Sequence, residues 1–521
     1  MNATVALLMF CFVSLPQIVP QEVISEDVEL GFFGELSRTI FFFGAHSNSS
    51  WGDSSFVYER PLAYLVTWCG VNVLSVLLIV VSMYMSYRRI KRAGDDGEGP
   101  YSSYSLIGWD HSVTSKEGGT MRSVAISTHL KEMMREEKAT RRRSVYEKLR
   151  LYCIRVLFNA VSLCVLGGSA GLIYYVADLS IGPGAGVPEA FGDFLQKYQL
   201  TILVSGLKVI IPPILNVLLV LERYHPRTQI KLQIARTAVF YAASLIVFLG
   251  SVFSVASSCM DSPVNATQTG MSDYCCWENE VGEQLFQVVI LDFIISLVFG
   301  LVFIAGRALV VKFCNATKLG YDDFDVPGLI LDLVYGQSLL WLGLYSAPFL
   351  SAVGVVKQTV LFYFHYGLAR ACCVPPRRVF RASRSGTFFL FVLLVSLLAC
   401  LVPMTYSILM IEPSESCGPF RQERWTYEVL TDRVGEASSW VQDGLRYASH
   451  PGLVVPLLLL LVLLVLYYRS KSSAHRQAAK DLRHHLQFER KVEKRRVFAT
   501  ARLAHGISQV GLVDAAGKNL A

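Results

Sequence analysis

Charged side chains stand inside several long apolar runs of this sequence. Asp292 and Asp332 each lie within such a run, and Lys208 lies in the middle of another, 198–221. An ionised side chain inside a membrane is costly and usually faces water or an oppositely charged partner. These residues are therefore the first candidates for chemistry, either as the lining of a water-filled path or as members of buried ion pairs.

The acids and the lysine predict opposite behaviour toward ions. Carboxylates in a pore replace part of the hydration shell of a cation and exclude anions, which would suit Asp292, Asp332 and the nearby Asp325. The alternative is that each acid is paired with a cation such as Arg307. Because a lysine in the same water would repel cations, we expect Lys208 to be neutralised by Asp292 or Asp332. Otherwise the path would be weakly selective or would pass anions.

Uncharged residues in the same runs offer fewer specific signals. Asn216, Gln337 and Ser338 either line the path or bond to a neighbouring helix. The pair Pro212-Pro213 removes helix hydrogen bonds and should kink the run 198–221. That kink is a candidate gating hinge, and it is equally consistent with plain architecture.

The elements that position these residues must be membrane-spanning helices. The chain is 53% hydrophobic and only 17% charged, whereas a soluble protein usually carries about 25% charge. A helix needs about 20 apolar residues to cross a bilayer. Ten segments are predicted to span, the first being the end of a span that starts before this sequence: 3–20, 61–86, 151–177, 198–221, 234–258, 284–311, 328–352, 353–371, 386–410 and 451–468.

Loop charge predicts the orientation of these spans. Cations concentrate in 87–150, in the loops after 221 and 371, and in the tail 469–521, whereas 259–283 has none. The positive-inside rule then places both termini in the cytoplasm of a multi-pass protein, which we expect at the plasma membrane. The loops 21–60 and 412–450 fall outside, and helices three to nine fill 151–411, with the expected pore at about 198–371.

Two kinds of side chain depend on this topology. Glycan acceptors at Asn48 and Asn265 fall outside, whereas Asn315 falls inside and should stay bare. Disulfides persist in the oxidising outside space, although spacing does not give their connectivity. The candidate cysteines are Cys259, Cys275, Cys276 and Cys417.

The cytoplasmic loop holds one more patterned segment, 124–141. Its apolar residues recur at helical spacing, with Lys and Glu opposite, which predicts an amphipathic helix. Met-rich apolar faces suit recognition by EF-hand proteins, and a surface helix on anionic lipid is the alternative. The candidate partner-binding residues are Ile126, Leu130, Met133 and Met134.

The sequence gives little support to other functional classes. We find no zinc-type spacing of Cys and His, no Gly-rich phosphate loop and no nucleophile–base set, so we expect no enzyme, no metal site and no cofactor. The formal charge of +7 is typical of cytoplasmic loops rather than of nucleic-acid binding.

Five ordered motifs resemble the transmembrane channel-like (TMC) family, and they cover nearly the whole chain. The segment 276–283, Cys-Trp-Glu-Asn-Glu-Val-Gly-Glu, is similar to the family's C-W-E-T-x-V-G-x-E, with Asn279 where Thr is usual and Gln284 where an acid is usual. The others lie at 221–228, 335–348, 380–385 and 413–420. Residues 108–110, 123–137 and 482–492 further resemble the branch that acts in hair-cell mechanotransduction.

This resemblance implies an all-α fold of ten helices, similar to TMEM16 and OSCA channels and scramblases. Helices four to eight would line a path in each protomer of a homodimer, with Asp292 and Asp325 along it. It also implies a calcium- and integrin-binding EF-hand partner on the cytoplasmic loop, other membrane proteins of a mechanotransduction complex, and lipids.

The function that follows is the pore-forming subunit of a mechanically gated, cation-permeable and Ca²⁺-conducting channel. A phospholipid scramblase and a regulatory membrane protein without conductance are the alternatives. A groove open to lipid should expose polar residues along a lipid-facing stripe, whereas a closed pore should hide them.

Overall fold

The computed structural model describes most of the chain up to residue 436. The described ranges are 1–18, 39–53, 56–92, 115–141, 145–181, 192–222, 224, 226–261, 276–313, 321–374, 382–414, 417–421 and 423–436, with scattered positions beyond. The chain divides into two units, Met1–Leu430 and Thr431–Ala521. The first unit holds nearly all the described helices.

Within the described residues, seven helices are long and apolar enough to cross a membrane. The helices that contain them are α4 (Arg60–Arg92), α7 (Val145–Ile181), α8 (Gly192–Leu221), α9 (Pro226–Asp261), α10 (Trp277–Phe299) with its continuation, α12 (Val326–Gly343) and α14 (Ala382–Met410). This confirms a helical multi-pass membrane protein.

The other three predicted spans are not among these seven helices. The segment 353–371 corresponds to α13 (Leu350–Ala371), which is long enough to cross but is less apolar because it carries Lys357, Gln358 and His365. The predicted first span corresponds to α1 (Asn2–Met9), a π-helical turn (Phe10–Ser14) and α2 (Leu15–Ile18), which together are too short. The segment 451–468 lies almost wholly outside the described residues.

The predicted boundary between 328–352 and 353–371 was wrong. Helix α12 ends at Gly343, and turns occupy 344–349 before α13 begins at Leu350. Pro348 explains the break, because it lacks an amide hydrogen and its ring obstructs a continuing helix. Hydrophobicity alone could not place this turn, since its residues are as apolar as those of the helices.

Two of the long helices contain irregular features. Helix α8 continues through both Pro212 and Pro213, so these prolines do not end it. Helix α10 runs through a π-helical segment (Gly300–Ala305) into α11 (Gly306–Phe313). Such π-segments frequently occur at functional sites.

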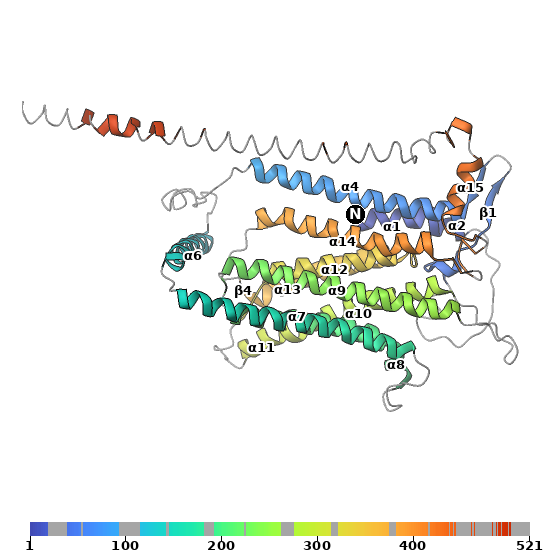
Figure 1. Ribbon diagram of the computed structural model, residues 1–521, viewed down its shortest axis with the longest axis horizontal. Coiled ribbons are helices and arrows are strands. Elements are labelled where there is room, and N and C mark those ends of the chain that lie inside the picture. Colours follow the sequence, from blue (N-terminus) through green and yellow to red (C-terminus); the bar gives the residue numbers. More distant parts are fainter. Residues whose placement is uncertain are drawn as a thin grey trace, which may run out of the picture. The chain divides into compact units, whose positions relative to one another are not determined.

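Helix α10 is the central element of the first unit. It contacts α8, α9, α12 and α13, while α14 packs against both α4 and α12. Its side chains Leu285, Val288 and Val289 are fully buried. In Figure 1 the long helices run side by side, with strand β1 at one end of the bundle and strand β4 at the other.

The end of the bundle that carries β1 is closed by a set of contacts that we call the disulfide end. Cys276 forms a disulfide with Cys417, 141 residues later. The backbone amide of Phe43 donates to Ser346 O over 2.9 Å, and the amide of Gly418 donates to Gly44 O over 3.3 Å. These bonds join loops that loop charge had placed on one side of the membrane.

Strands are short in the described residues. Strands β1 (Ser50–Asp53) and β2 (Phe56–Glu59) form an antiparallel hairpin before α4, and β3 (Asp322–Asp323) pairs in parallel with β4 (Cys373–Val374). The predicted loop helix is present as α6 (Lys116–Arg141). The short helix α15 (Glu428–Glu436) spans the boundary between the two units.

Candidate functional site

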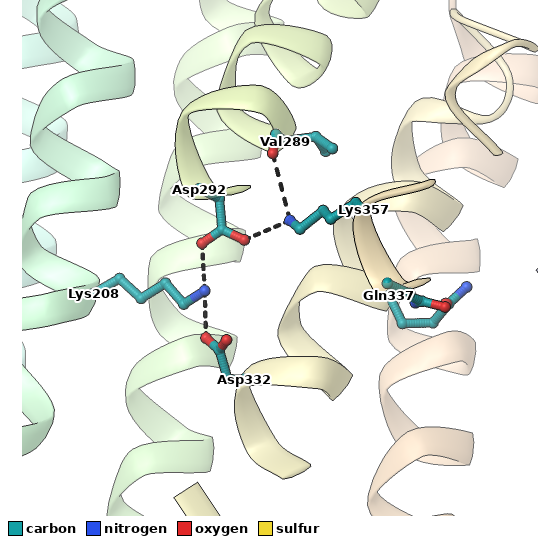
Figure 2. Close-up of polar contacts among 7 residues, drawn as sticks. Lys208, Val289, Asp292, Asp332, Gln337 and Lys357 are labelled. Atoms are coloured by element: carbon teal, nitrogen blue, oxygen red, sulfur yellow. Dashed lines mark hydrogen bonds and ion pairs between the residues drawn. The ribbon is translucent and has the colours of Figure 1, made fainter. Parts of the chain in front are cut away.

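The charged residues of four helices meet in one chain of ion pairs. Lys208 of α8 pairs with Asp292 of α10 and also with Asp332 of α12. Lys357 of α13 lies 2.6 Å from the other carboxylate oxygen of Asp292. Figure 2 shows the resulting order, Lys357–Asp292–Lys208–Asp332, in which positive and negative charges alternate. We call this set the ion-pair chain.

Three of its four members are almost completely buried. Exposed fractions are 8% for Lys208, 3% for Asp292 and 6% for Lys357, whereas the Asp332 side chain is 26% exposed. Two lysines and two aspartates carry no net formal charge, so the buried charges are balanced. The expectation that Lys208 is neutralised is confirmed.

Surrounding groups complete the setting of the two ammonium groups. The Nζ atom of Lys208 lies 4.8 Å from the centre of the Tyr335 ring, a distance at which the ring face attracts a cation. Lys357 Nζ also approaches the carbonyl oxygen of Val289 at 3.4 Å. Each lysine therefore has further electron-rich neighbours on α12 or α10.

A second polar group, which is uncharged, is centred on Gln337 and lies partly on the same helices as the ion-pair chain. Gln337 of α12 accepts a hydrogen bond from Asn2 over 2.7 Å and from Gln358 of α13 over 3.0 Å. Its own amide donates back to Asn2 over 3.0 Å. Gln337 thus bonds neighbouring helices, which was one of its two predicted uses.

A cavity of about 380 Å³ lies between α12 and α13 and ends at the ion-pair chain. Asp292, Asp332 and Lys357 form its polar end, and His365 lies further along α13. The rest of the wall is mainly apolar. The apolar and aromatic lining residues are Phe324, Leu329, Leu333, Leu340, Leu361, Phe362 and Tyr366.

A smaller cavity of about 260 Å³ lies on the other side of Lys357. It is lined by α10 and by the first turns of α13, including Val289, Phe293 and Val353. Lys357 lines both cavities. Its side chain therefore stands between two spaces that follow each other along α13.

The disulfide end explains the motif at 276–283. The carboxylate of Glu278 is fully buried and accepts hydrogen bonds from the backbone amide of Ser414, over 2.9 Å, and from the Ser414 hydroxyl. The Trp277 indole donates to Glu412 O over 3.2 Å. At Gly282 an added Cβ would lie 2.8 Å from Ser346 O, so a larger residue would separate α10 from the 344–346 turn.

The same end buries His46. Burial lowers the pKa of this imidazole to about 4; the backbone of Ile40 acts against this shift, and the charge of Arg60 adds to it. The Arg421 guanidinium donates to His46 O over 3.3 Å. His46 is therefore neutral at physiological pH.

The other predicted site residues lie apart from the ion-pair chain. Asp325 caps the start of α12, where it accepts from Gly328 N at 3.4 Å and from the Gln233 amide at 3.4 Å. Asn216 lies half-buried on α8 about two turns after Lys208. Whether these residues, or the prolines at 212–213, meet an ion path stays a prediction.

Several predicted residues can be placed only in part. Two of the candidate cysteines, Cys276 and Cys417, form a disulfide. Cys275, Asn265, Asn315 and the side chain of Cys259 lie outside the described residues. On α6, Ile126 and Leu130 are half-buried and Met134 is exposed. The side chain of Met133 also lies outside the described residues.

Two polar features were missed by the sequence reasoning. Lys357 stands in an apolar run, and the same criterion that found Lys208 would have found it. Arg236 of α9 pairs with the fully buried Glu222 at 2.7 Å and donates to Asn159 over 2.6 Å. Glu222 belongs to the motif at 221–228, which suggests that the motif fixes the junction of α7, α8 and α9.

Known proteins resemble this chain over most of its length. The TMC domain profile matches residues 276–383. Transmembrane channel-like protein 2-B of Danio rerio is 27% identical over 506 residues, 89% of this chain and 56% of the relative. Transmembrane channel-like protein 2 of Mus musculus is 26% identical over 92% of this chain and 57% of its own length.

A third relative gives the same result. Transmembrane channel-like protein 1 of Homo sapiens is 26% identical over 474 residues, which are 82% of this chain and 61% of the relative. The chain thus spans less than two thirds of the length of these relatives. The matched region contains the ion-pair residues Asp292, Asp332 and Lys357, and the chain is similar to members of the TMC family over most of its length.

Proposed function

We propose that this protein forms the ion-conducting path of a mechanically gated, cation-permeable channel. The observation that carries the proposal is the burial of four charged and amide side chains in its helices. Lys208, Asp292, Gln337 and Lys357 are each less than a tenth exposed. A closed pore hides such residues, whereas a groove open to lipid would present them on the outer surface.

The preference for cations rests on the position of Asp332. It is the most exposed member of the ion-pair chain and lies at the polar end of the larger cavity. The lining of this cavity contains two carboxylates, Asp292 and Asp332, and one ammonium group, Lys357, so an ion in the cavity meets more negative than positive charge. Divalent cations such as Ca²⁺ are attracted most strongly, because the Coulomb energy scales with charge.

The mechanical stimulus is the part of the proposal that depends on resemblance to the hair-cell branch. The direct test uses the full chain in phosphatidylcholine liposomes, with ion flux and lipid transfer between leaflets measured together under membrane tension. We expect tension-dependent cation flux without lipid transfer. Lipid transfer without ion flux would identify a lipid pathway. The absence of both ion flux and lipid transfer would indicate a regulatory protein. Each of these two results would overturn the proposal.

We also propose a homodimer in the plasma membrane, with both termini cytoplasmic. This orientation places α6 and its basic neighbours in the cytoplasm, where an EF-hand protein of the calcium- and integrin-binding class would bind. Exchange of Met133 and Met134 for Glu should abolish co-purification with such a partner and leave surface expression intact. Unchanged co-purification would point instead to lipid as the ligand of α6.

A further inference from the structure

Packing does not require a lysine at position 357 of α13, because the two cavities that it lines are otherwise mainly apolar. It lies at the boundary between the cavities of about 380 Å³ and about 260 Å³. Apart from this residue, the smaller cavity is lined by aliphatic, aromatic and alanine side chains. An ion that passed from one space to the other would meet the Lys357–Asp292 pair first.

The connectivity of the ion-pair chain makes its two ends unequal. Lys208 holds two carboxylates, those of Asp292 and Asp332, whereas Lys357 holds only Asp292. If Lys357 withdraws, one lysine remains with two aspartates and the chain changes from neutral to a formal charge of −1. The chain without Lys357 therefore has the charge that favours cations.

Helix α13 is also placed to withdraw. Its side chains Val360 and Tyr363 are exposed, so this side of the helix is open to movement, whereas its other sides contact α1, α10 and α12. At Gly354 an added Cβ would clash with a Leu340 methyl carbon, which shows that α12 and α13 approach closely one turn before Lys357. A small shift of α13 at this contact would move the ammonium group relative to Asp292.

We propose that Lys357 is the latch of the pore and a determinant of its ion selectivity. In the closed state its bond to Asp292 joins α13 to α10 and separates the two cavities. On opening, α13 carries Lys357 away, the cavities join, and Asp292 and Asp332 are left with Lys208 as a cation-selective site. The inference rests on the proposed conduction and adds a residue and a movement to it.

The test compares Lys357→Met with Lys312→Met, which removes an exposed lysine from α11, outside the ion-pair chain. Both are reconstituted as full chains, and open probability and reversal potential are measured against tension. We expect Lys357→Met to raise the open probability without tension by roughly tenfold or more, the range typical of coupling to a two-state equilibrium. Its currents should also select cations over anions at least as strongly as those of wild type.

One further variant separates a latch from a folding defect. Lys357→Arg keeps the charge that pairs with Asp292 and leaves the Lys208–Asp292 pair in place, so it should behave as wild type. Opening by Lys357→Met that matches Lys312→Met, or a Lys357→Arg variant that opens as readily as Lys357→Met, would overturn the latch.

A second readout does not depend on conduction. Spin labels at the exposed positions Val298 on α10 and Val360 on α13 report the distance between these helices. Lys357→Met should broaden this distance distribution, and Lys312→Met should not. If wild type shows no conduction while Lys357→Met still broadens the distance distribution, the proposed function fails and the latch between helices stands. A distance distribution that Lys357→Met leaves unchanged contradicts the latch.

Discussion

Two of the buried carboxylates of this molecule, Asp292 and Glu278, are stabilised in different ways. In the ion-pair chain, Asp292 lies between the ammonium groups of Lys208 and Lys357. At the disulfide end, Glu278 accepts hydrogen bonds from the neutral amide and hydroxyl of Ser414. That end is covalently closed by Cys276–Cys417 and holds a buried neutral histidine.

The difference separates a fixed region from one that can change. Hydrogen bonds to a backbone amide beside a disulfide hold one geometry. Ion pairs between side chains of four different helices depend on how those helices are placed, and a buried pair adds little net stability for the charges it confines. We therefore interpret the disulfide end as the anchor of the bundle and the ion-pair chain as its functional part.

The largest effect should come from opening the disulfide. Replacing Cys276 and Cys417 with Ser frees a loop closed across 141 residues, and loss of such a bond typically lowers the free energy of unfolding by about 2–5 kcal/mol. Thermal unfolding of the purified protein should shift accordingly, while the reversal potential of remaining channels stays at the wild-type value. A shifted reversal potential with unchanged unfolding would reverse the two assignments.

A comparable loss should follow from Asp292→Asn. This change leaves two buried lysines with one aspartate, and an uncompensated buried charge typically costs about 3–5 kcal/mol. Adding Lys357→Met removes the excess charge and should recover part of the loss, whereas Asp432→Asn at an exposed position should have little effect on unfolding. If the free energy of unfolding does not recover in the double variant, charge balance is not what stabilises the ion-pair chain.

His46 makes its own contribution to the pH dependence of stability at the disulfide end. The folded protein binds this proton only near pH 4, whereas the unfolded chain binds it near pH 6.5. Between these values the unfolded state holds more protons at this residue, so the contribution of His46 to the free energy of unfolding falls as pH is lowered, by about 2 kcal/mol from pH 7.5 to 5. The difference in free energy of unfolding between wild type and His46→Gln should change by this amount over that range, whereas His365→Gln should follow wild type.

The smallest effect should come from removing glycan acceptors, which report which end of the bundle faces outward. Asn48 lies beside Ser47 and Ser49, which both accept hydrogen bonds from Arg60 at the disulfide end. If that end is extracellular, Asn48→Gln and Asn265→Gln should each remove an endoglycosidase-sensitive shift in gel mobility, and neither should alter ion selectivity. A glycan on Asn315 would overturn the predicted topology.

Sequence reasoning predicted the spans better than it predicted their contacts. The helix class and Lys208 with its carboxylate partners followed from the cost of a charge in a membrane. The boundary at 344–349 did not, because a turn at Pro348 is as apolar as its flanking helices. The role of Lys357 required knowing that α13 packs against α10, a long-range contact that periodicity does not encode.

The most direct test of the ion-pair chain as the conduction site is the reversal potential between Ca²⁺ and K⁺ under bi-ionic conditions. Wild type, Asp292→Asn and Lys208→Met are compared at matched surface density. Asp292→Asn should lower both Ca²⁺ permeability relative to K⁺ and unitary conductance, and Lys208→Met should shift selectivity less. An Asp292→Asn channel with unchanged reversal potential and conductance, or a Lys208→Met change that turns an anion current into a cation current, would contradict the account.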